Sequence, residues 1–317
     1  MKYYVGIDLG GTNIVAGVVD ENYNILSKAS KKTNCPRPAA EIAADMGDCA
    51  IEAIAKANLK IDDIEWIGIG TPGIADNENG VIEYANNLGF KDVPMAEYIK
   101  KKINKPVYLA NDANAAAYGE FVAGAAKGAK NAVCITLGTG VGGGIIIDGK
   151  IYAGSNCAGA EIGHMVIEVD GPDCTCGMKG CFEVFSSATG LIRMSKEAME
   201  QDKESAMWQI SNEHGSRVTA RTSFDAMRAG DKTAKAVVDK YIKYLAMGIT
   251  NTINIFQPDV LCIGGGVCNE GDTLLLPVKA LVAQNVYTKN SKKNTEIVIA
   301  KLGNDAGIIG AAFLGNA

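Results

Sequence analysis

Short apolar runs alternate with helical patterns along the chain. Residues 3–7 and 14–19 are apolar and flank a glycine-rich polar stretch at 8–13, which predicts two strands joined by a tight loop. Apolar residues near a 3.6-residue period predict a helix over 39–57. The same patterns place further strands at 66–69, 107–110, 132–137, 260–263 and 296–300, and further helices at 93–102, 112–123, 188–201, 232–256 and 305–314. Strands and helices that mix throughout predict an α/β fold.

The opening pattern returns near the middle of the chain. An apolar run at 132–137 is followed by a glycine-rich stretch at 138–144, expected to be a loop, and by β-branched residues at 145–147. Ile7-Asp8-Leu9-Gly10 aligns with Ile135-Thr136-Leu137-Gly138. The repeat predicts two halves, each of which opens with a glycine-rich β-hairpin.

Length, charge and the length of the apolar runs indicate the number of domains and exclude some classes of partner. The 317 residues correspond to about two domains at about 150 residues each. The net charge is −5 and no basic block occurs, so we expect no nucleic-acid partner. Every apolar run stops well short of the roughly 18 residues that a membrane helix needs, so we expect no membrane partner. Asp8 interrupts the first run before a signal-peptide core can form, which predicts a cytoplasmic protein.

Glycine is abundant, with 37 residues that lie largely at predicted strand ends, where backbone N–H groups can cradle phosphate. One such loop alone would be an ordinary turn, but three loops favour phosphate binding. The stretch 138–143 matches the dinucleotide fingerprint G-x-G-x-x-G. That fingerprint must open a helix, whereas a β-branched run follows here, so a Rossmann fold is excluded. The P-loop pattern is also missing, which leaves phosphate loops inside β-hairpins.

Asp112 is the first candidate for a catalytic role. It follows the predicted strand 107–110 and opens a predicted helix. Phosphoryl transfer to an alcohol needs a carboxylate that accepts the hydroxyl proton. Aspartate is also a favoured N-cap residue, and the residues alone favour this capping role.

A cluster of cysteines predicts a metal site. Three of the nine cysteines, Cys174, Cys176 and Cys181, lie within eight residues, and His164 precedes them by ten. This is the Cys₃His donor set of a structural Zn²⁺ site, in which no position stays open for water. The other six cysteines stand apart and are expected to be small core residues rather than disulfide partners.

Several motifs together resemble a known family. The stretches 8–13 and 137–144 resemble the two phosphate loops of the sugar-kinase and actin ATPase superfold, and residues 111–114, 159–164 and 174–183 resemble the ROK family of bacterial sugar kinases, glucokinases above all. The resemblance implies an actin-like/ribonuclease H-like ATPase fold with two domains and a cleft between them. We expect a small domain at 1–120, a C-terminal helix at about 302–317 that packs back on it, and a larger zinc-bearing domain at 121–301.

The resemblance also implies an activity and a set of site residues. It implies phosphorylation of a hexose, above all glucose, at the 6-hydroxyl with ATP and Mg²⁺; Asp112 is then the general base, and Asp8 lies near Mg²⁺-ATP. The matching nucleotide-binding positions are Asp8, Gly10, Gly11, Thr12, Asn13, Thr136, Gly138, Thr139, Gly140, Gly142, Gly264, Gly265 and Gly266. The matching sugar-binding positions are Gly73, Asn87, Asn111, Asp112, Glu161, His164 and Glu183.

Some of these positions leave alternatives open. Glu161 and Glu183 alone would be solvated surface acids, and the resemblance makes them sugar ligands. His164 is implied to touch both zinc and sugar. Phe90 stands where glucokinases carry Trp, which weakens the glucose assignment.

Other functions on the same scaffold are an N-acetylhexosamine kinase, a fructokinase, or a sugar-sensing ROK regulator without its DNA-binding module. We expect no such module here, because the first predicted strand starts at Tyr3. We further expect a homodimer or homotetramer that acts in glycolysis and carbohydrate metabolism.

Overall fold

The computed structural model describes residues 1–317 and divides into two compact units. Unit 1 comprises Met1–Cys134, Gly144–Ala160 and Ala300–Ala317, and unit 2 comprises Ile135–Gly143 and Glu161–Ile299. Contacts thus group residues 121–134 and 144–160 with the N-terminal part, whereas the sequence placed them in the second domain. The domain limits 1–120 and 121–301 remain a prediction.

Unit 1 is built on a five-stranded sheet in the order β3-β2-β1-β4-β8. The strands are β1 (Tyr3–Leu9), β2 (Asn13–Asp20), β3 (Ile25–Lys32), β4 (Ile64–Thr71) and β8 (Val107–Asn111). The pairs β1–β2 and β2–β3 are antiparallel, while β1–β4 and β4–β8 are parallel. The carboxyl ends of β1, β4 and β8 therefore share one edge of the sheet, where ligands of α/β proteins commonly bind.

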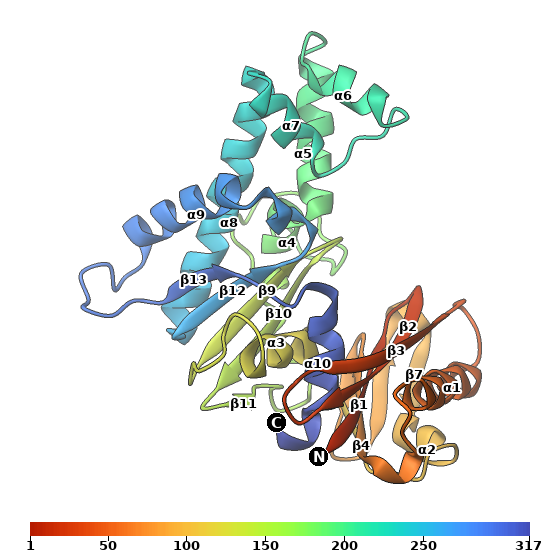
Figure 1. The fold of residues 1–317 in the computed structure, drawn as a ribbon. Coiled ribbons are helices and arrows are strands. Elements are labelled where there is room, and N and C mark those ends of the chain that lie inside the picture. Colours follow the sequence, from red (N-terminus) through yellow and green to blue (C-terminus); the bar gives the residue numbers. More distant parts are fainter. The chain divides into compact units, whose positions relative to one another are not determined.

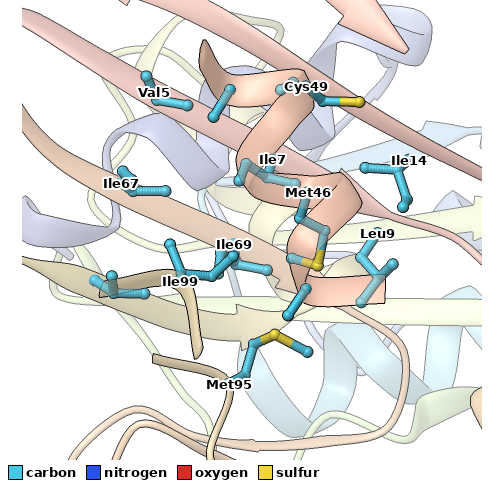
Figure 2. Close-up of a cluster of buried hydrophobic side chains, with 14 of the residues drawn as sticks. Val5, Ile7, Leu9, Ile14, Met46, Cys49, Ile67, Ile69, Met95 and Ile99 are labelled. Carbon is cyan, nitrogen blue, oxygen red and sulfur yellow. The ribbon is translucent and has the colours of Figure 1, made fainter. Parts of the chain in front are cut away.

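The core of unit 1 forms where helix α1 (Ala39–Lys56) covers one face of this sheet. Figure 2 shows Met46 and Cys49 of the helix among isoleucine side chains of the strands. Met46, Cys49, Ile7 and Ile69 are each 0% exposed. Alternate residues of β1 point into this core, which explains the strand and helix patterns of the sequence.

The opposite face of the sheet carries α10 (Ala306–Ala312). Glycines make this approach possible: a Cβ on Gly6 would lie 1.9 Å from the Ile308 carbonyl oxygen, and one on Gly68 would lie 1.7 Å from that of Ala311. Figure 1 shows α10 beside α3 (Asp112–Val122), its main helical contact. These glycines lie inside strands, so part of the glycine excess serves helix packing rather than phosphate binding, contrary to its predicted location at strand ends.

A smaller three-stranded sheet completes unit 1, in the order β5-β6-β7. Its strands are β5 (Ile74–Asp76), β6 (Val81–Ala85) and β7 (Phe90–Val93), which α2 (Met95–Lys100) follows. The sequence patterns did not predict these strands, because each spans only three to five residues. The 3₁₀ turn Asn86–Leu88 connects β6 to β7, so this sheet carries the segment expected to contact sugar.

The second five-stranded sheet has the order β11-β10-β9-β12-β13. Its strands are β9 (Ala132–Leu137), β10 (Val141–Ile147), β11 (Lys150–Ile151), β12 (Val260–Gly264) and β13 (Glu296–Ile299). The order repeats that of the first sheet, third-second-first-fourth-fifth, in agreement with the predicted internal duplication. β10 begins at Val141, so the predicted loop at 138–144 is shorter than expected.

Unit 2 also contains most of the helices. These are α4 (Phe182–Ser186), α5 (Ala188–Gln201), α6 (Met207–Glu213), α7 (Thr222–Arg228), α8 (Lys232–Phe256) and α9 (Asp272–Asn285). The predicted bounds of α5 and α8 are confirmed. No helix of the protein combines the length and the hydrophobicity that crossing a membrane requires.

Candidate functional site

The first glycine loop, between β1 and β2, is a tight turn, and Thr33 donates hydrogen bonds to two of its carbonyl groups. The Gly10 N–H donates to the Asn13 carbonyl oxygen at 2.9 Å. Thr33 donates its N–H to the Thr12 carbonyl at 2.9 Å and its hydroxyl to the Gly10 carbonyl at 2.6 Å. Thr33 is fully buried, whereas Gly11, Thr12 and Asn13 are exposed. The loop therefore presents the predicted nucleotide residues on a fixed backbone.

Asp8 and Asp112 lie at the shared edge of the first sheet. Asp8 pairs in register with Gly70 of β4, and Gly70 pairs with Ala110 of β8, two residues before Asp112. Since Gly70 has no side chain, nothing from the intervening strand separates the two carboxylates. Burial, and then the charge of Asp112, raises the pKa of Asp8 from 3.8 to about 6. Burial also raises the pKa of Asp112, against a hydrogen bond from the Ala113 N–H that lowers it.

The N-cap of α3 is Asn111, not Asp112. The Asn111 side-chain oxygen accepts hydrogen bonds from the N–H groups of Ala113 at 2.9 Å and Asn114 at 3.3 Å. Asp112 is the first residue of the helix. The capping role that competed with catalysis is therefore wrong for Asp112, because Asn111 fills it, while Asp112 Oδ1 accepts a hydrogen bond from the N–H of Ala113 at 2.8 Å.

The other unit 1 residues expected to bind sugar lie near this edge. The Asn111 amide donates to the Gly73 carbonyl oxygen at 3.1 Å. Gly73 has φ +84°, and a Cβ there would lie 2.0 Å from the Tyr84 carbonyl oxygen, so only glycine fits. Asn87 is exposed, and its Cβ lies 3.9 Å from where a Cβ on Gly11 would be. Unit 1 thus places Asn87 beside its predicted phosphate loop, while Asn111 at the end of β8 holds the Gly73 carbonyl.

Phe90 belongs to the core. Its side chain is 3% exposed and packs in the same hydrophobic cluster as the main sheet. The Phe90 side chain therefore contributes to the packing of this core.

The second glycine loop, between β9 and β10, is held at both ends within unit 2. The Gly138 carbonyl accepts a hydrogen bond from the Ala188 N–H at 2.9 Å, and the Val141 N–H donates to Glu183 Oε2 at 2.8 Å. The third glycine segment lies against this loop, since a Cβ on Gly265 would lie 2.3 Å from the Leu137 carbonyl oxygen. Two of the three predicted nucleotide segments are therefore neighbours.

The predicted metal ligands come together in one cluster. The Nδ1 or Nε2 of His164 and the Sγ atoms of Cys174, Cys176 and Cys181 lie within 4.8 Å of one another. The Cys174 Sγ to His164 Nδ1 distance and the Cys176 to Cys181 Sγ distance are both 3.6 Å. Tetrahedral zinc with bonds of about 2.3 Å to sulfur places its ligands about 3.8 Å apart. The donor set and spacing fit Zn²⁺.

Backbone pairing shapes the metal segment. Val166 pairs with Cys181, and Asp173 pairs with Lys179 in a small hairpin. Gly177 and Gly180 adopt φ of +90° and +67°, which this tight path requires. The ligands thus lie on a segment that the chain itself brings into shape.

His164 and Glu161 belong to one short turn. The His164 N–H donates to the Glu161 carbonyl at 3.1 Å, within the 3₁₀ helix Ile162–His164. Since Nδ1 of His164 faces Cys174, Nε2 is the nitrogen that remains for another partner. Glu183 follows the ligand Cys181 by two residues, in α4.

Not every functional contact could be predicted. No sequence feature pointed to Thr33, because its partners at Gly10 and Thr12 are more than twenty residues away and an isolated threonine in a polar stretch carries no signal. Gly307 also borders the site: a Cβ there would lie 3.2 Å from Asp8 Oδ2, so a larger residue at that position of α10 would press against the Asp8 carboxylate.

Comparison with known proteins identifies the family. The model of the ROK family matches residues 4–317. The chain belongs to the ROK family. A glucokinase of Halalkalibacterium halodurans is 39% identical over 99% of this chain and 94% of its own length, and a glucokinase of Thermotoga maritima is 36% identical over 98% and 96%.

Solved structures agree with this assignment. A ROK hexokinase from Thermus thermophilus matches 98% of this chain and 97% of its own with a TM-score of 0.82 and 32% identity. A ROK glucokinase from Streptomyces griseus, solved with glucose and AMPPNP, matches 98% of each chain with a TM-score of 0.79 and 32% identity. The expected actin-like, two-domain α/β fold is confirmed.

Proposed function

We propose that this protein is an ATP-dependent glucokinase that transfers the γ-phosphoryl group of ATP to the 6-hydroxyl of glucose. The observation that carries the proposal is Asp112, a partly buried carboxylate with a raised pKa. The neighbouring residue Asn111, not Asp112, is the N-cap of the helix α3. Its position at the sheet edge opposite Asp8 suits a general base beside a phosphate loop. The similarity to glucokinases runs along almost the whole chain.

In this mechanism Asp112 accepts the proton of the glucose 6-hydroxyl as O6 attacks the γ-phosphorus. A new O–P bond forms, the bond between the γ-phosphorus and its bridging oxygen breaks, and ADP leaves with that electron pair. The base must be ionised before the reaction. Because burial raises the pKa of Asp112, the ionised carboxylate is a stronger base than that of an exposed aspartate.

Asp8 and the glycine loops are proposed to serve the nucleotide. A buried carboxylate whose pKa the charge of a second carboxylate raises suits a divalent cation, and a bound Mg²⁺ would supply positive charge to the phosphoryl oxygens. Asp8 would hold this ion. The loops at 10–13, 138–142 and 264–266, together with Thr136, would donate backbone and hydroxyl groups to the phosphates and nucleoside.

The sugar would be bound by polar groups on elements with little freedom. His164 Nε2 would donate to or accept from a hydroxyl, and Nδ1, which faces Cys174, would be the nitrogen that binds Zn²⁺. Glu161, Glu183, Asn87 and the Gly73–Asn111 pair would provide the remaining partners. We propose that the Cys₃His cluster binds one structural Zn²⁺, which orients His164 without entering the chemistry.

A coupled assay with ATP across several hexoses tests this function. A site that hydrogen-bonds each hydroxyl can discriminate by about 10⁴ between sugars, because a missing partner leaves buried polar groups unpaired. We expect the highest kcat/KM for glucose, with N-acetylmannosamine and fructose far behind. A preference of tenfold or more for an N-acetylhexosamine or fructose would replace the glucokinase by the corresponding kinase, and no turnover with any sugar would favour a regulator.

The setting of this activity is proposed on the same basis. We propose a cytoplasmic homodimer or homotetramer that supplies glucose 6-phosphate to glycolysis. Light scattering of the purified protein measures its oligomeric state.

A further inference from the structure

Glu183 contacts the nucleotide loop as well as the metal segment. Its Oε2 accepts the Val141 N–H at 2.8 Å, where β10 begins directly after the loop. The other end of the loop is held by the Ala188 N–H, which donates to the Gly138 carbonyl at 2.9 Å. Both contacts come from the same stretch, 183–188. The loop between Gly138 and Val141 is therefore fastened to the short helix that carries a proposed sugar ligand.

Gly140 shows how closely the carboxylate lies against the loop. A Cβ on Gly140 would lie 2.2 Å from Oε2, 3.1 Å from Cδ and 3.7 Å from Oε1 of Glu183, and these are its three nearest atoms. The φ of Gly140 is not in the left-handed region, so its backbone conformation does not require glycine. The absence of a side chain at this position makes room for Glu183.

Glu183 itself sits on a rigid support. Its neighbour Phe182 is fully buried, and a Cβ on Gly248 of α8 would lie 2.2 Å from the Phe182 ring, so the helix α4 is packed tightly on α8. Cys181, two residues before Glu183, belongs to the metal cluster. The backbone of Glu183 is therefore held in place, and the carboxylate can move only by rotation of its own side chain.

We propose that Glu183 couples sugar binding to nucleotide binding. One carboxylate oxygen holds the Val141 N–H, and the other accepts a hydroxyl of the sugar, so that bound glucose fixes the carboxylate and with it the loop that contacts the phosphates. This inference rests on the proposed function, which supplies the two ligands. Coupling of this kind is reciprocal and commonly amounts to about 5–150-fold in affinity. Glucose should tighten AMPPNP binding, and AMPPNP should tighten glucose binding by the same factor.

The test is the dissociation constant of AMPPNP with Mg²⁺, measured by calorimetry without glucose and with saturating glucose. In the parent protein, the dissociation constant without glucose should be about tenfold higher than that with saturating glucose. This ratio measures the coupling. Gly140→Ala should push the carboxylate off Val141 and bring the ratio to within twofold of one, while the thermal midpoint stays close to that of the parent, because the atom that must move is the end of a flexible side chain. Glu183→Ala should abolish the ratio as well.

Two comparisons separate coupling from ordinary loop damage. Gly138→Ala makes the same change two residues away, where a Cβ meets nothing within 4 Å, and should keep the ratio near the parental value whatever its effect on AMPPNP affinity. In the Glu183→Ala background, Gly140→Ala should leave AMPPNP affinity unchanged, because the clashing group is gone. Equal loss of AMPPNP affinity in both backgrounds would mean that Gly140 serves the phosphates directly and would overturn the inference.

The outcomes also distinguish this inference from the proposed function. A parent protein that phosphorylates glucose but binds AMPPNP equally well with and without it overturns the coupling alone. A Gly140→Ala protein that keeps the parental ratio of the two dissociation constants also overturns the coupling alone. A parent protein that neither binds nor phosphorylates glucose overturns both.

Discussion

Replacing Asp8 by asparagine should make the protein more stable at pH 8 while it lowers activity. The pKa of Asp8 is about 6 in the folded protein against 3.8 ordinarily, because of burial and of the Asp112 charge. A group whose pKa is raised on folding favours the folded state at low pH, and that contribution is lost as the pH rises through the folded pKa. A shift of about two pKa units corresponds to a ceiling of about 3 kcal/mol, and partial exposure of the side chain reduces it. We expect a gain of about 1–3 kcal/mol for Asp8→Asn at pH 8.

Thermal unfolding in magnesium-free buffer between pH 4 and 8 measures this effect. For a chain of this length the gain corresponds to a rise of about 2–4 °C in the midpoint at pH 8. The rise should shrink steadily below about pH 6.5 and nearly vanish at about pH 4, where Asp8 is protonated in the folded protein and half protonated in the unfolded chain. An unchanged or lowered midpoint at pH 8, or a rise that persists undiminished at pH 4, would refute the account of this carboxylate.

Asp20 provides a control of opposite sign in the same unit. Burial raises its pKa, but hydrogen bonds from the side chain and N–H of Asn24 and from the N–H of Asn22 lower it more, and the pKa lies below the ordinary value. Asp20→Asn should therefore lower the midpoint at pH 8, and the loss should diminish toward acid pH.

Three further substitutions test the site. Asp112→Asn should lower kcat by about 10²–10⁴ without lowering the thermal midpoint, because Asn111 is the helix cap and burial disfavours the charged form of Asp112; a kcat within threefold of the parent would exclude a general base there. Asn111→Ala should cost about 1 kcal/mol of stability through the lost cap and should raise the KM for glucose, and a KM unchanged in steady-state kinetics would limit Asn111 to its structural role. Cys176→Ser should lower zinc content and reduce kcat/KM for glucose at least tenfold while far-ultraviolet circular dichroism stays close to the parent; full activity without zinc, or global unfolding, would contradict a local structural metal.

The elements that the sequence predicts well carry their own local signals. The helices α5 and α8 begin after Ser187 and Asp231, whose side chains accept the N–H groups of Gly190 and Ala234, and both show strong apolar periodicity. The helix α9 was not predicted, because Pro277 lies inside it and apolar residues appear all around it. Local sequence patterns therefore predict helices with a side-chain cap and clear apolar periodicity, such as α5 and α8, but not α9.

The metal cluster shows what short-range spacing can establish. Its cysteines are neighbours in sequence and His164 is only ten residues away, so the donor set could be predicted before its geometry was seen. The N-cap of α3, in contrast, could not be assigned from the sequence. Asn111 and Asp112 are both good caps, and only the non-helical backbone of Asn111 and the hydrogen bonds of its side chain decide between them.

Contacts between distant segments could not be predicted. The Thr33 hydroxyl meets Gly10 across 23 residues, and Glu183 meets Val141 across 42. The role of a glycine depends in the same way on what lies opposite: Gly6 and Gly68 admit α10, whereas Gly140 admits a carboxylate. Each of these was set by packing of the whole unit, which composition and periodicity do not contain.

The most direct test of the proposed function identifies the product itself. The protein should be incubated with uniformly ¹³C-labelled glucose, ATP and Mg²⁺, and the mixture followed by ¹³C and ³¹P nuclear magnetic resonance. We predict that glucose 6-phosphate and ADP form in equal amounts, with phosphorus coupling at carbons 6 and 5 and at no other carbon, and that Asp112→Asn protein forms almost none in the same time. No phosphorylated glucose, or a phosphate on any other hydroxyl, would contradict the account.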